Sequence, residues 1–564
     1  NAETPFTNQA QVGDLLTVPV AHGDGNYTAD EATLDRLERQ GWIERSESLG
    51  STRAALVRPL SATILLDALS DMRRRYLASF LAEGLVGATP TPERIHLLIE
   101  DGRLTEAAER AIPCARRYLE IGEPVQAAEV TQAVLPLLSE TDILPDDEAE
   151  LHLLHANAML TIRPTDPSIV RSLDRVPQLG DNPNRRARTD LARAELHWVI
   201  GHYPNFHKTL LNAWERGPEG VAPRVSASIA YQLGYGCIWS GKPRSAGEWF
   251  ECSRQIANEA NDPLAIGYAL LGRGTLLYSW GDMVNAERDA MQAMETFQRI
   301  GDQSGHWRAL SLWTQVLRLQ GRISEALEVL YERIPEARRS QANSLHVQLL
   351  LNAAECEMVL FRLGRAQECV DELEAATQKG DHLHLRLQAM LVHGEIALAS
   401  GHLAEAAGLL QQAQRRATTA SLVIPAERAR ARLAETLWRL GDRNEAREMF
   451  RGAILGLIGT GDITAQAEAC VWCARSLARN YQPSGIFNPV RGFLDQQPVP
   501  VLHLEETIAK AVYAESHGDR EVAGELWRSA AKTLNQLSER LNDTDQAALR
   551  VHPWARQIRV GVEQ

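Results

Sequence analysis

The sixteen residues LGRGTLLYSWGDMVNA, numbers 271 to 286, contain the pattern that decides the fold. Gly281 marks a turn, a small residue, Gly274, precedes it by seven positions, and Ala286 follows it by five. Turns of the same kind recur at spacings of forty residues or a multiple of forty, at Gly241, Gly321, Gly401 and Gly441. Repetition at a fixed period predicts a repeat architecture rather than a set of unrelated domains.

The residues on either side of these turns repeat as well. Two helices that cross closely need a side chain no larger than a methyl group where their backbones meet, and a tight turn favours Gly because Gly tolerates positive φ. We therefore interpret the small residues as packing and turn positions, not as chemical groups of an active site. The same spacing links Gly234, Gly241 and Ala246; Gly394, Gly401 and Ala406; and Ala434, Gly441 and Ala446. Further turns are predicted at Gly102, Gly122, Gly201, Gly364 and Gly518.

A second series of helix breaks lies midway between the glycine turns. Turns that alternate every twenty residues predict antiparallel helices of roughly 14 to 17 residues, which is the arrangement of an α-solenoid. The breaks are Asn261-Asp262-Pro263, Gly301-Asp302, Gly380-Asp381 and Gly461-Asp462. Residues 481 to 500 are rich in Pro and Gly, and predict a loop that replaces or distorts one hairpin. The predicted fold class is all-α, an α-solenoid with a small α/β or winged-helix-like segment at its N-terminus.

The Gly and Ala positions resemble those of the tetratricopeptide repeat, although the period of that family is shorter, about 34 residues. The longer period resembles the elongated repeats at the C-terminal end of large bacterial ATP-dependent regulators, of the LuxR type or linked to kinases. This resemblance implies a sensing or scaffolding arm attached to a signalling module.

Residues 1 to 41 differ from the repeats, and predict a strand, a Gly-rich loop and a helix that begins near Asp30. The stretch resembles an internal segment of the glutaminase subunit of phosphoribosylformylglycinamidine synthase, an amidotransferase of purine biosynthesis. The family usually has Glu where this chain has Asp24. The matching words are TPFTN at residues 4 to 8, VGD at residues 12 to 14 and PVAHGDGNY at residues 19 to 27.

Glutaminase chemistry needs a cysteine nucleophile together with a His and a Glu that activate it. The chain has no Cys before Cys114, and the family's His-x-Glu pair would fall among the helical repeats. His22 does not match the family's catalytic His. We therefore expect this segment to have no glutaminase activity.

Residues 30 to 70 predict a partial winged-helix-like junction. A helix is followed by two short strands, at Trp42 to Arg45 and Ala55 to Arg58, on either side of the polar turn SESLGST. The expected divisions are an amidotransferase-like segment at 1–29, this junction at 30–70, helical linker hairpins at 71–139, the solenoid at 140–541 and a C-terminal cap at 542–564.

Composition narrows the classes of function. The net charge of −14 argues against a general nucleic-acid-binding surface, which needs a basic stripe. Seven scattered cysteines do not form a disulfide framework, and favour a reducing compartment. With no long apolar run and no leader in the sequence, we expect a cytoplasmic protein that does not span a membrane.

Three motifs suggest chemistry, and in each case a structural role is favoured. The stretch from Gly236 to Lys242 satisfies G-x-x-x-x-G-K, but Pro243 follows where a phosphate-binding loop needs Ser or Thr. Cys470 and Cys473 form a C-x-x-C without a second pair, so two buried small residues are expected. The histidine pairs are interpreted as solvated or locally hydrogen-bonded side chains; they are His152 with His155, and His382 with His384. No catalytic residue, metal site or cofactor is predicted.

A binding surface is predicted on the concave side of the repeats. If the array keeps tetratricopeptide geometry, the residue six positions before each glycine turn faces that surface, and polar side chains there are typical of a binding groove. The candidates are Glu195, Tyr235, Thr275, Gln315, Glu395 and Glu435. Aromatic residues just before the turns, Phe361 among them, are expected to fill the gaps between hairpins.

The leading hypothesis is a non-enzymatic scaffold or sensor arm that binds a protein partner or a small effector in bacterial signalling or transcription regulation. Because the chain begins at Asn1, we expect an ATPase or kinase module upstream. Two alternatives stay open: an inactive fragment related to a glutamine amidotransferase, and a stand-alone tetratricopeptide adaptor. The repeats themselves are expected to bind neither nucleic acid nor a membrane.

Overall fold

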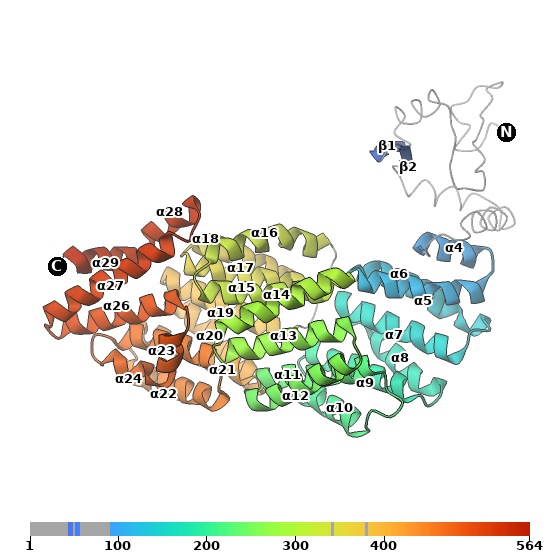
Figure 1. The fold of residues 1–564 in the computed structure, drawn as a ribbon, viewed down its shortest axis with the longest axis horizontal. Coiled ribbons are helices and arrows are strands. Elements are labelled where there is room, and N and C mark those ends of the chain that lie inside the picture. Colours follow the sequence, from blue (N-terminus) through green and yellow to red (C-terminus); the bar gives the residue numbers. More distant parts are fainter. Residues whose placement is uncertain (1–42, 49–50, 57–90, 340–342, 378–381, 564) are drawn as a thin grey trace. The chain divides into compact units, whose positions relative to one another are not determined.

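The computed structural model describes residues 43–48, 51–56, 91–339, 343–377 and 382–563 (Figure 1). The chain divides into two compact units, residues 1–114 with 129–147 and residues 115–128 with 148–564. The amidotransferase-like segment and the helical parts of the winged-helix-like junction lie outside the described residues. The domain divisions expected from the sequence therefore stay predictions.

The first unit contains a two-stranded antiparallel sheet. Strand β1 (Ile43–Ser48) pairs with β2 (Ser51–Leu56), with Ile43 opposite Leu56. The two predicted strands are present, and each extends further into the polar SESLGST stretch than the sequence indicated. The first helices of the chain that the structure describes are α4 (Pro92–Glu100), α5 (Leu104–Glu120), α6 (Pro124–Val134) and the 3-10 helix η1 (Leu135–Glu140).

The second unit is an array of helical hairpins, preceded by α7 (Pro145–Ile162), α8 (Pro167–Arg175) and the 3-10 helix η2 (Val176–Leu179). The first helices of the hairpins are α9 (Pro183–Val199), α11 (Pro223–Trp239), α13 (Pro263–Ser279), α15 (Gln303–Leu319), α17 (Asn343–Val359), α19 (Leu383–Ser400), α21 (Val423–Leu440), α23 (Ile463–Leu477) and α26 (Pro500–Ser516). The second helices are α10 (Tyr203–Glu215), α12 (Pro243–Glu259), α14 (Met283–Ile300), α16 (Ile323–Arg339), α18 (Leu363–Thr377), α20 (Leu403–Thr419), α22 (Arg443–Thr460) and α27 (Arg520–Ser538).

First and second helices differ in how they are buried. Helix α12, a second helix, buries a single stripe at Ala246, Phe250, Ser253 and Ala257. Helix α13, a first helix, buries residues on all sides, from Ala265 through Ser279. A helix that is apolar on one stripe only packs against one layer, whereas a helix buried all round lies between layers. The first helices therefore form the inner layer of the array, and the second helices cover it.

The residues between helices explain where each helix begins and ends. Asp262, Asp302 and Asp462 precede α13, α15 and α23, and each side chain accepts a hydrogen bond from a backbone N–H of the first turn. Such N-caps satisfy donors that have no partner within the helix. Gly301 and Gly461 end the preceding helices in the left-handed conformation. The second series of breaks predicted from the sequence is confirmed at these positions.

The glycine turns and their small companions are also confirmed. Gly241, Gly281, Gly321, Gly401 and Gly441 all have positive φ, between 69° and 103°. A Cβ atom at Gly234 would lie 2.6 Å from Phe250, and one at Gly394 would lie 2.7 Å from Leu410, so the helix pairs meet closely there. The alanines five positions after the turns, including Ala246 and Ala406, are fully buried.

One predicted turn is wrong. Gly364 lies inside α18 (Leu363–Thr377), and the turn before that helix has positive φ at Phe361 instead. Phe361 lies forty residues after Gly321, so the period is kept although the turn residue is not Gly. A non-Gly residue costs free energy in the left-handed region, so Phe is not recognised as a turn residue from its type. Phe361 is the turn residue itself, not an aromatic residue that precedes a turn.

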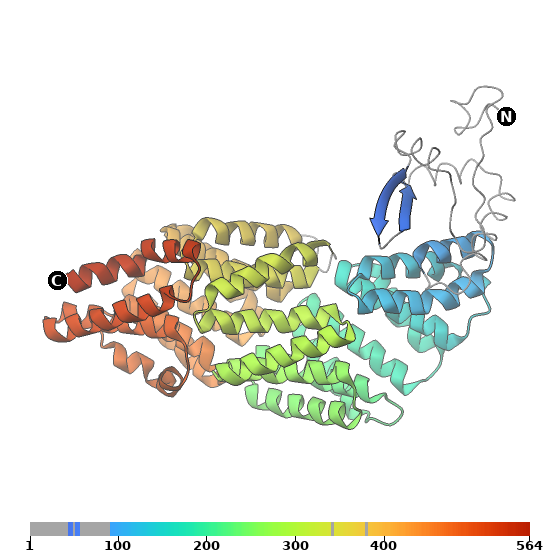
Figure 2. The same cartoon turned by 45° about the horizontal axis from the view of Figure 1, so that its top comes forward.

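The array folds back so that its C-terminal helices lie against its middle helices (Figures 1 and 2). The hydroxyl of Thr464 on α23 donates to the carbonyl of Tyr278 on α13 at 2.6 Å, and the N–H of Met283 donates to Gln497 at 3.1 Å. A Cβ at Gly281 would lie 2.5 Å from Phe493. Gly281 is therefore needed for the close approach of a distant segment as well as for its own turn.

The hairpin that begins with α23 is distorted, as the Pro-rich stretch predicted. Short helices α24 (Pro483–Phe487), η3 (Asn488–Val490) and α25 (Arg491–Gln496) take the place of one long second helix. The array ends with α28 (Asp543–Val551) and α29 (Pro553–Glu563). None of the helices in the described ranges combines the length and apolarity that crossing a membrane requires.

Candidate functional site

The six predicted groove residues occupy equivalent positions on six first helices: Glu195 on α9, Tyr235 on α11, Thr275 on α13, Gln315 on α15, Glu395 on α19 and Glu435 on α21. Because Phe361 is the turn of the intervening repeat, the same position on α17 is Glu355, which is not among the six predicted residues. Continuing the forty-residue spacing beyond Glu435 gives Arg475 on α23. We call these positions, together with the residues seven before each of them, the first-helix face, since residues i and i+7 share one side of a helix.

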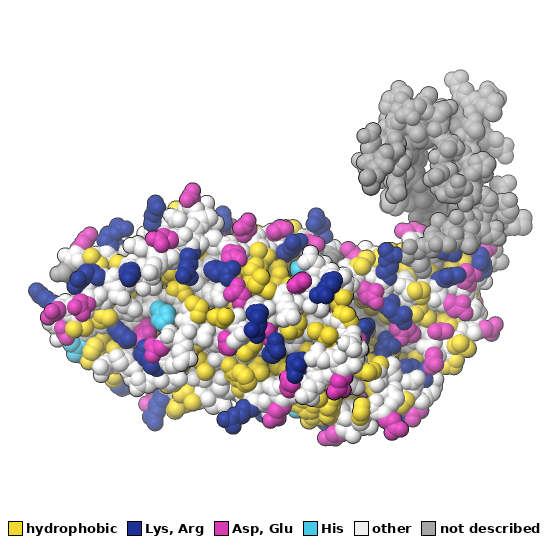
Figure 3. All heavy atoms as spheres, viewed as in Figure 1, with side chains coloured by type: hydrophobic (Ala, Val, Ile, Leu, Met, Phe, Trp, Pro, Cys, Tyr) yellow, Lys and Arg dark blue, Asp and Glu magenta, His cyan; other side chains and the backbone are white. Residues whose placement is uncertain are grey.

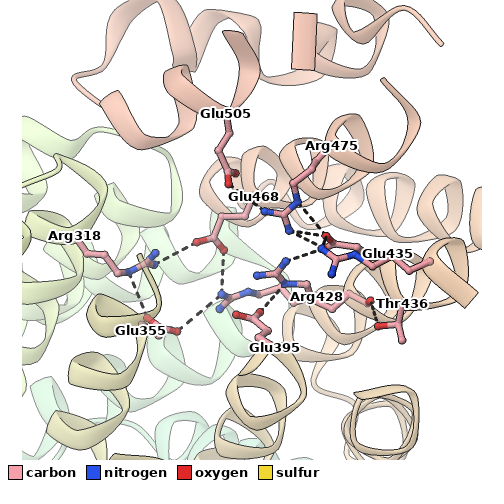
Figure 4. A network of polar contacts seen from close by, with 11 residues as sticks. Arg318, Glu355, Glu395, Arg428, Glu435, Thr436, Glu468, Arg475 and Glu505 are labelled. Carbon is pink, nitrogen blue, oxygen red and sulfur yellow. Dashed lines mark hydrogen bonds and ion pairs between the residues drawn. The ribbon is translucent and has the colours of Figure 1, made fainter. Parts of the chain in front are cut away.

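The C-terminal half of the first-helix face runs from the end of α15 to α23. Its side chains, together with neighbouring arginines, form a network of arginines and glutamates (Figure 4). Arg318 on α15 contacts Glu355 on α17 at 3.4 Å and Glu468 on α23 at 3.3 Å. Arg428 on α21 contacts the other carboxylate oxygen of Glu468 at 3.0 Å. The side chain of Glu468 is 9% exposed, so two arginines neutralise one nearly buried carboxylate.

The network continues through two of the predicted residues. Arg432 donates to Glu395 at 2.9 Å and to Glu435 at 2.8 Å. Arg475 donates to both oxygens of Glu435, at 2.7 and 2.8 Å, and to Glu505 on α26 at 3.1 Å. Burial alone would raise the pKa of Glu435, but the neighbouring arginines lower it to about 2. Glu435 is therefore ionised and held in the network.

These ion pairs join helices that are far apart in the sequence. Arg318 and Glu468 are 150 residues apart, and Arg475 and Glu435 are 40 apart. A buried charge that loses its partner is costly, so a closed network fixes the relative positions of the helices that carry it. Glu395 and Glu435 thus have a structural role in addition to the binding role that the sequence suggested.

Two other predicted residues have local partners. The amide of Gln315 donates to Asn352 on α17 at 3.4 Å, and Asn352 in turn donates to the carbonyl of Ser311 at 2.9 Å. The hydroxyl of Thr275 donates to the carbonyl of Leu271, one turn earlier in α13, at 2.9 Å. Both side chains are half-buried.

The N-terminal half of the first-helix face comprises α9, α11, α13 and the first part of α15. It differs from the C-terminal half in whether its charged side chains are paired. Arg308 on α15 is exposed and Glu195 on α9 is half-buried, and neither forms an ion pair or hydrogen bond with any other residue in the described part of the chain. They lie within electrostatic range of each other: burial raises the pKa of Glu195, and Arg308 opposes that shift. Surrounding protein lowers the pKa of Arg308, but Tyr268, Tyr231 and Glu195 raise it above its usual range.

Aromatic side chains from three first helices lie near these two charges. Tyr268 on α13 lies 5.3 Å from Tyr231 on α11, and Tyr231 lies 6.4 Å from Tyr235, measured between ring centroids. Tyr235 continues the row to Trp198 on α9 at 5.3 Å. The three tyrosines are half-buried. Tyr235 and Glu195, both predicted from the sequence, are thus brought together with an unpredicted Arg308.

Most of the motifs given a structural interpretation have structural surroundings, but His382 and His384 are buried and not solvated. Cys470 and Cys473 are buried within α23, and burial raises the pKa of Cys470 to about 12, so its thiol is not reactive. His152 bonds to Ser172 at 3.1 Å and His155 to Ser168 at 3.0 Å. Gly236 lies within α11 and Pro243 begins α12. Among the residues that the structure describes, no group of three His, Cys, Asp or Glu side chains is placed to hold a metal ion.

On the face drawn in Figure 3, Lys and Arg side chains alternate with Asp and Glu over the helices of the second unit. Interspersed charges do not produce the continuous positive potential that nucleic-acid binding requires.

Comparison with curated proteins shows a short local similarity to PurQ. No protein-family model matches the chain. The subunit PurQ of phosphoribosylformylglycinamidine synthase from Lacticaseibacillus casei (strain BL23) is 60% identical over 43 residues, which are 8% of this chain and 19% of that protein. PurQ from Alkaliphilus metalliredigens (strain QYMF) is 50% identical over 42 residues, 7% of this chain and 19% of that protein. The chain therefore spans about a fifth of the length of these curated relatives.

Solved structures are similar over far more of the chain. A Rap protein complexed with Competence and Sporulation Factor has a TM-score of 0.32 and 13% identity, over 77% of this chain and 99% of that chain. The APC/C hetero-tetramer Cut9-Hcn1 has a TM-score of 0.41 and 9% identity, over 90% of this chain and 97% of that chain. A signal transduction ATPase with a tetratricopeptide repeat sensor from Pyrococcus horikoshii has a TM-score of 0.29 and 14% identity, over 72% of this chain and 55% of that chain. One of these three proteins has a tetratricopeptide repeat sensor. The fold assignment itself rests on the helices and turns described above.

Proposed function

We propose that this chain is a non-catalytic helical-repeat scaffold that binds a protein partner or a small effector on the N-terminal half of its first-helix face. The observation that carries the proposal is the contrast between the two halves of that face. In the C-terminal half, the arginines are paired with glutamates of the same chain. In the N-terminal half, Arg308 and Glu195 are left without such partners beside partly exposed tyrosines.

Unpaired charges beside aromatic surface are what a binding surface offers, because a ligand can then supply the missing partners. Helical repeats present such surfaces over long distances. The arrangement also suits a sensor: occupancy at Arg308 on α15 would act on the same helix that carries Arg318, the first residue of the charged network. A signal could thus pass from the occupied half to the C-terminal helices, in the manner of two coupled sites.

The biological setting belongs to the same proposal. We assign the scaffold to bacterial signalling or transcription regulation, as the arm of a protein whose ATPase or kinase module provides the output. A stand-alone adaptor would use the same surface without such a module. Deleting residues 183–538 from the longer protein that carries the ATPase or kinase module distinguishes the two. Loss of regulation of that module's activity would indicate a sensor arm, and unchanged regulation would indicate an adaptor.

Photo-crosslinking in the native host tests the proposed surface. We would place p-benzoylphenylalanine at Tyr235, and as a control at Met291, which is 52% exposed on the outer helix α14. The expected result is an added mass at Tyr235 but not at Met291. The purified occupant should then bind the native chain about tenfold or more tightly than the R308Q variant. Crosslinks at Met291 alone, or equal binding by R308Q, would refute the proposal.

The PurQ-like similarity motivates a second test of the non-enzymatic assignment. The PurQ-like words of the sequence, within residues 4 to 27, lie outside the described part of the chain, and the sequence offers no cysteine nucleophile there. Incubating the purified chain with glutamine should release no glutamate above the uncatalysed rate. Release at a catalytic rate would favour the amidotransferase-related alternative.

A further inference from the structure

The unpaired charges of the first-helix face differ in sign, and this difference restricts what can bind there. Arg308 is exposed on α15, and Glu195 is half-buried on α9. Two first helices, α11 and α13, lie between α9 and α15 in the array. The guanidinium and the carboxylate influence each other electrostatically but do not form an ion pair.

Other carboxylates near Arg308 are already engaged. Asp302 precedes Arg308 in the same repeat, but its side chain accepts a hydrogen bond from the N–H of Gly305 at 3.2 Å, where it caps α15. Burial raises the pKa of Asp302, and Tyr268 is among the groups that oppose this shift. Among the described residues, Glu195 is therefore the one nearby carboxylate without a hydrogen-bonding partner. Its counterparts Glu395 and Glu435, at the same position on α19 and α21, are each bonded to Arg432.

The surface near the two charges is aromatic. Tyr268, Tyr231 and Tyr235 form a continuous row that reaches Trp198 on α9. Trp239 extends the row at 6.2 Å from Tyr235, and His384 lies beside both tryptophans. Tyrosine rings offer apolar faces together with hydroxyl groups that can both donate and accept hydrogen bonds.

We infer that the N-terminal half of the first-helix face binds a small zwitterion with an apolar side chain, of the amino-acid or dipeptide class. The ligand's carboxylate bonds to the Arg308 guanidinium, whose planar fork suits a carboxylate. Its ammonium bonds to Glu195, and its side chain lies against the tyrosine row, where the rings also favour a cation. This inference rests on the proposed function and specifies its ligand.

A single charge on the ligand would leave one side of the site unsatisfied. A simple anion would pair with Arg308 but add negative charge near Glu195 and Asp302. A simple cation would pair with Glu195 but lie within range of Arg308. A zwitterion satisfies both residues and adds no net charge, so the arrangement favours it over either.

Matched probes separate these possibilities by isothermal titration calorimetry on the full chain. The zwitterions are L-phenylalanine and phenylalanyl-glycine, which differ in the separation of their charges. N-acetylphenylalanine lacks the ammonium, and phenethylamine lacks the carboxylate. We expect one of the zwitterions to bind about tenfold or more tightly than both singly charged probes, as expected for one lost charge-assisted hydrogen bond.

Two variants test which residue binds the carboxylate of the ligand and which binds its ammonium. In R308Q, the advantage of the zwitterion over phenethylamine should disappear, and in E195Q its advantage over N-acetylphenylalanine should disappear. R254Q is the control, since Arg254 forms an exposed pair with Glu251 on the outer helix α12. R308K, which keeps the charge, should retain part of the affinity. Circular dichroism establishes that each variant is folded.

The inference is overturned if no probe binds at about 20 mM, if a singly charged probe binds as tightly as the better zwitterion, or if R308Q and E195Q bind all probes as the native chain does. A macromolecular crosslink at Tyr235 that depends on Arg308, together with absent zwitterion binding, would refute the ligand class while supporting the proposed function. Absence of both the Arg308-dependent crosslink and zwitterion binding would refute the ligand class and the proposed function.

Discussion

Arg318 on α15 donates to Glu468 on α23 at 3.3 Å, across 150 residues of sequence. This ion pair connects a middle helix of the array to a C-terminal one, beside the hydrogen bond from Thr464 to the carbonyl of Tyr278. The pair shows that the repeats do not only stack on their neighbours in sequence. A helical array with such contacts is stiffer than one held by adjacent hairpins alone, because moving one end must break bonds in the middle.

Removing the carboxylate of Glu468 is expected to destabilise the second unit. The E468Q variant leaves Arg318 and Arg428 with an uncompensated charge in a largely buried place, which costs about 3 kcal/mol. The unfolding midpoint in urea measures the loss. The control is E251Q, whose pair with Arg254 is exposed and should cost at most about 1 kcal/mol. Equal losses for the two variants would contradict a stabilising role of the network.

Gly281 and Gly401 form a matched pair for testing the fold-back. Both have positive φ, 80° and 85°, so alanine at either position costs about 1 kcal/mol of backbone strain. Only at Gly281 would the new methyl group meet another segment, Phe493 at 2.5 Å, whereas nothing lies within 4 Å at Gly401. G281A should therefore lose about 1–3 kcal/mol more than G401A in urea unfolding. Equal destabilisation would show that the two segments do not pack there.

Stability is expected to fall at mildly acidic pH, in part because of His384. Burial lowers its pKa to about 3, and His382 and Arg308 add to that shift. Since the folded-state pKa lies below the usual value of 6.5, the contribution is fully present above pH 6.5 and is lost as the pH falls toward 3. Over that window the unfolded chain binds one extra proton, which corresponds to a slope of about 1.4 kcal/mol per pH unit.

The H384N variant removes this group, so the free energy of unfolding should depend less steeply on pH between about 6 and 4. H402N is the control, because the side chain of His402 is 69% exposed. An unchanged slope in H384N would mean that His384 is protonated in the folded state.

Cys470 and Cys473 should not react with a thiol reagent while the chain is folded. Both side chains are buried, and burial raises the pKa of both thiols, so the thiolate needed for reaction is scarce. Titration with 5,5′-dithiobis(2-nitrobenzoate) before and after unfolding, with mass spectrometry to locate the label, measures this. Rapid labelling of either residue in the folded chain would revive a redox role for the C-x-x-C motif.

The features that could be predicted from the sequence are those determined by residues close together in the chain. Turn residues such as Gly241 and caps such as Asp262 act through their own backbone, so the hairpins and their period could be predicted directly. Gly364 was misassigned because the true turn residue, Phe361, adopts a conformation that Gly normally takes. The same error hid Glu355 from the register of candidate residues, although Glu355 lies forty positions after Gln315.

The candidate site was predicted only in part because its residues meet through tertiary structure. The spacing placed Glu195 and Tyr235 at equivalent positions, but it gave no sign that Glu395 and Glu435 share Arg432. Arg308 was missed because its neighbours come from three other helices. The contact of Gly281 with Phe493 joins residues 212 positions apart, for which local patterns carry no signal.

The most direct test of the account is an experimental structure of the second unit with its occupant bound, determined by electron cryo-microscopy of the crosslinked and purified complex. We predict density for the occupant against Arg308, Glu195 and Tyr235, with the ion pair between Arg318 and Glu468 still in place. An occupant bound instead to the outer helices α12, α14 and α16, with the surface at Arg308 empty, would contradict the account.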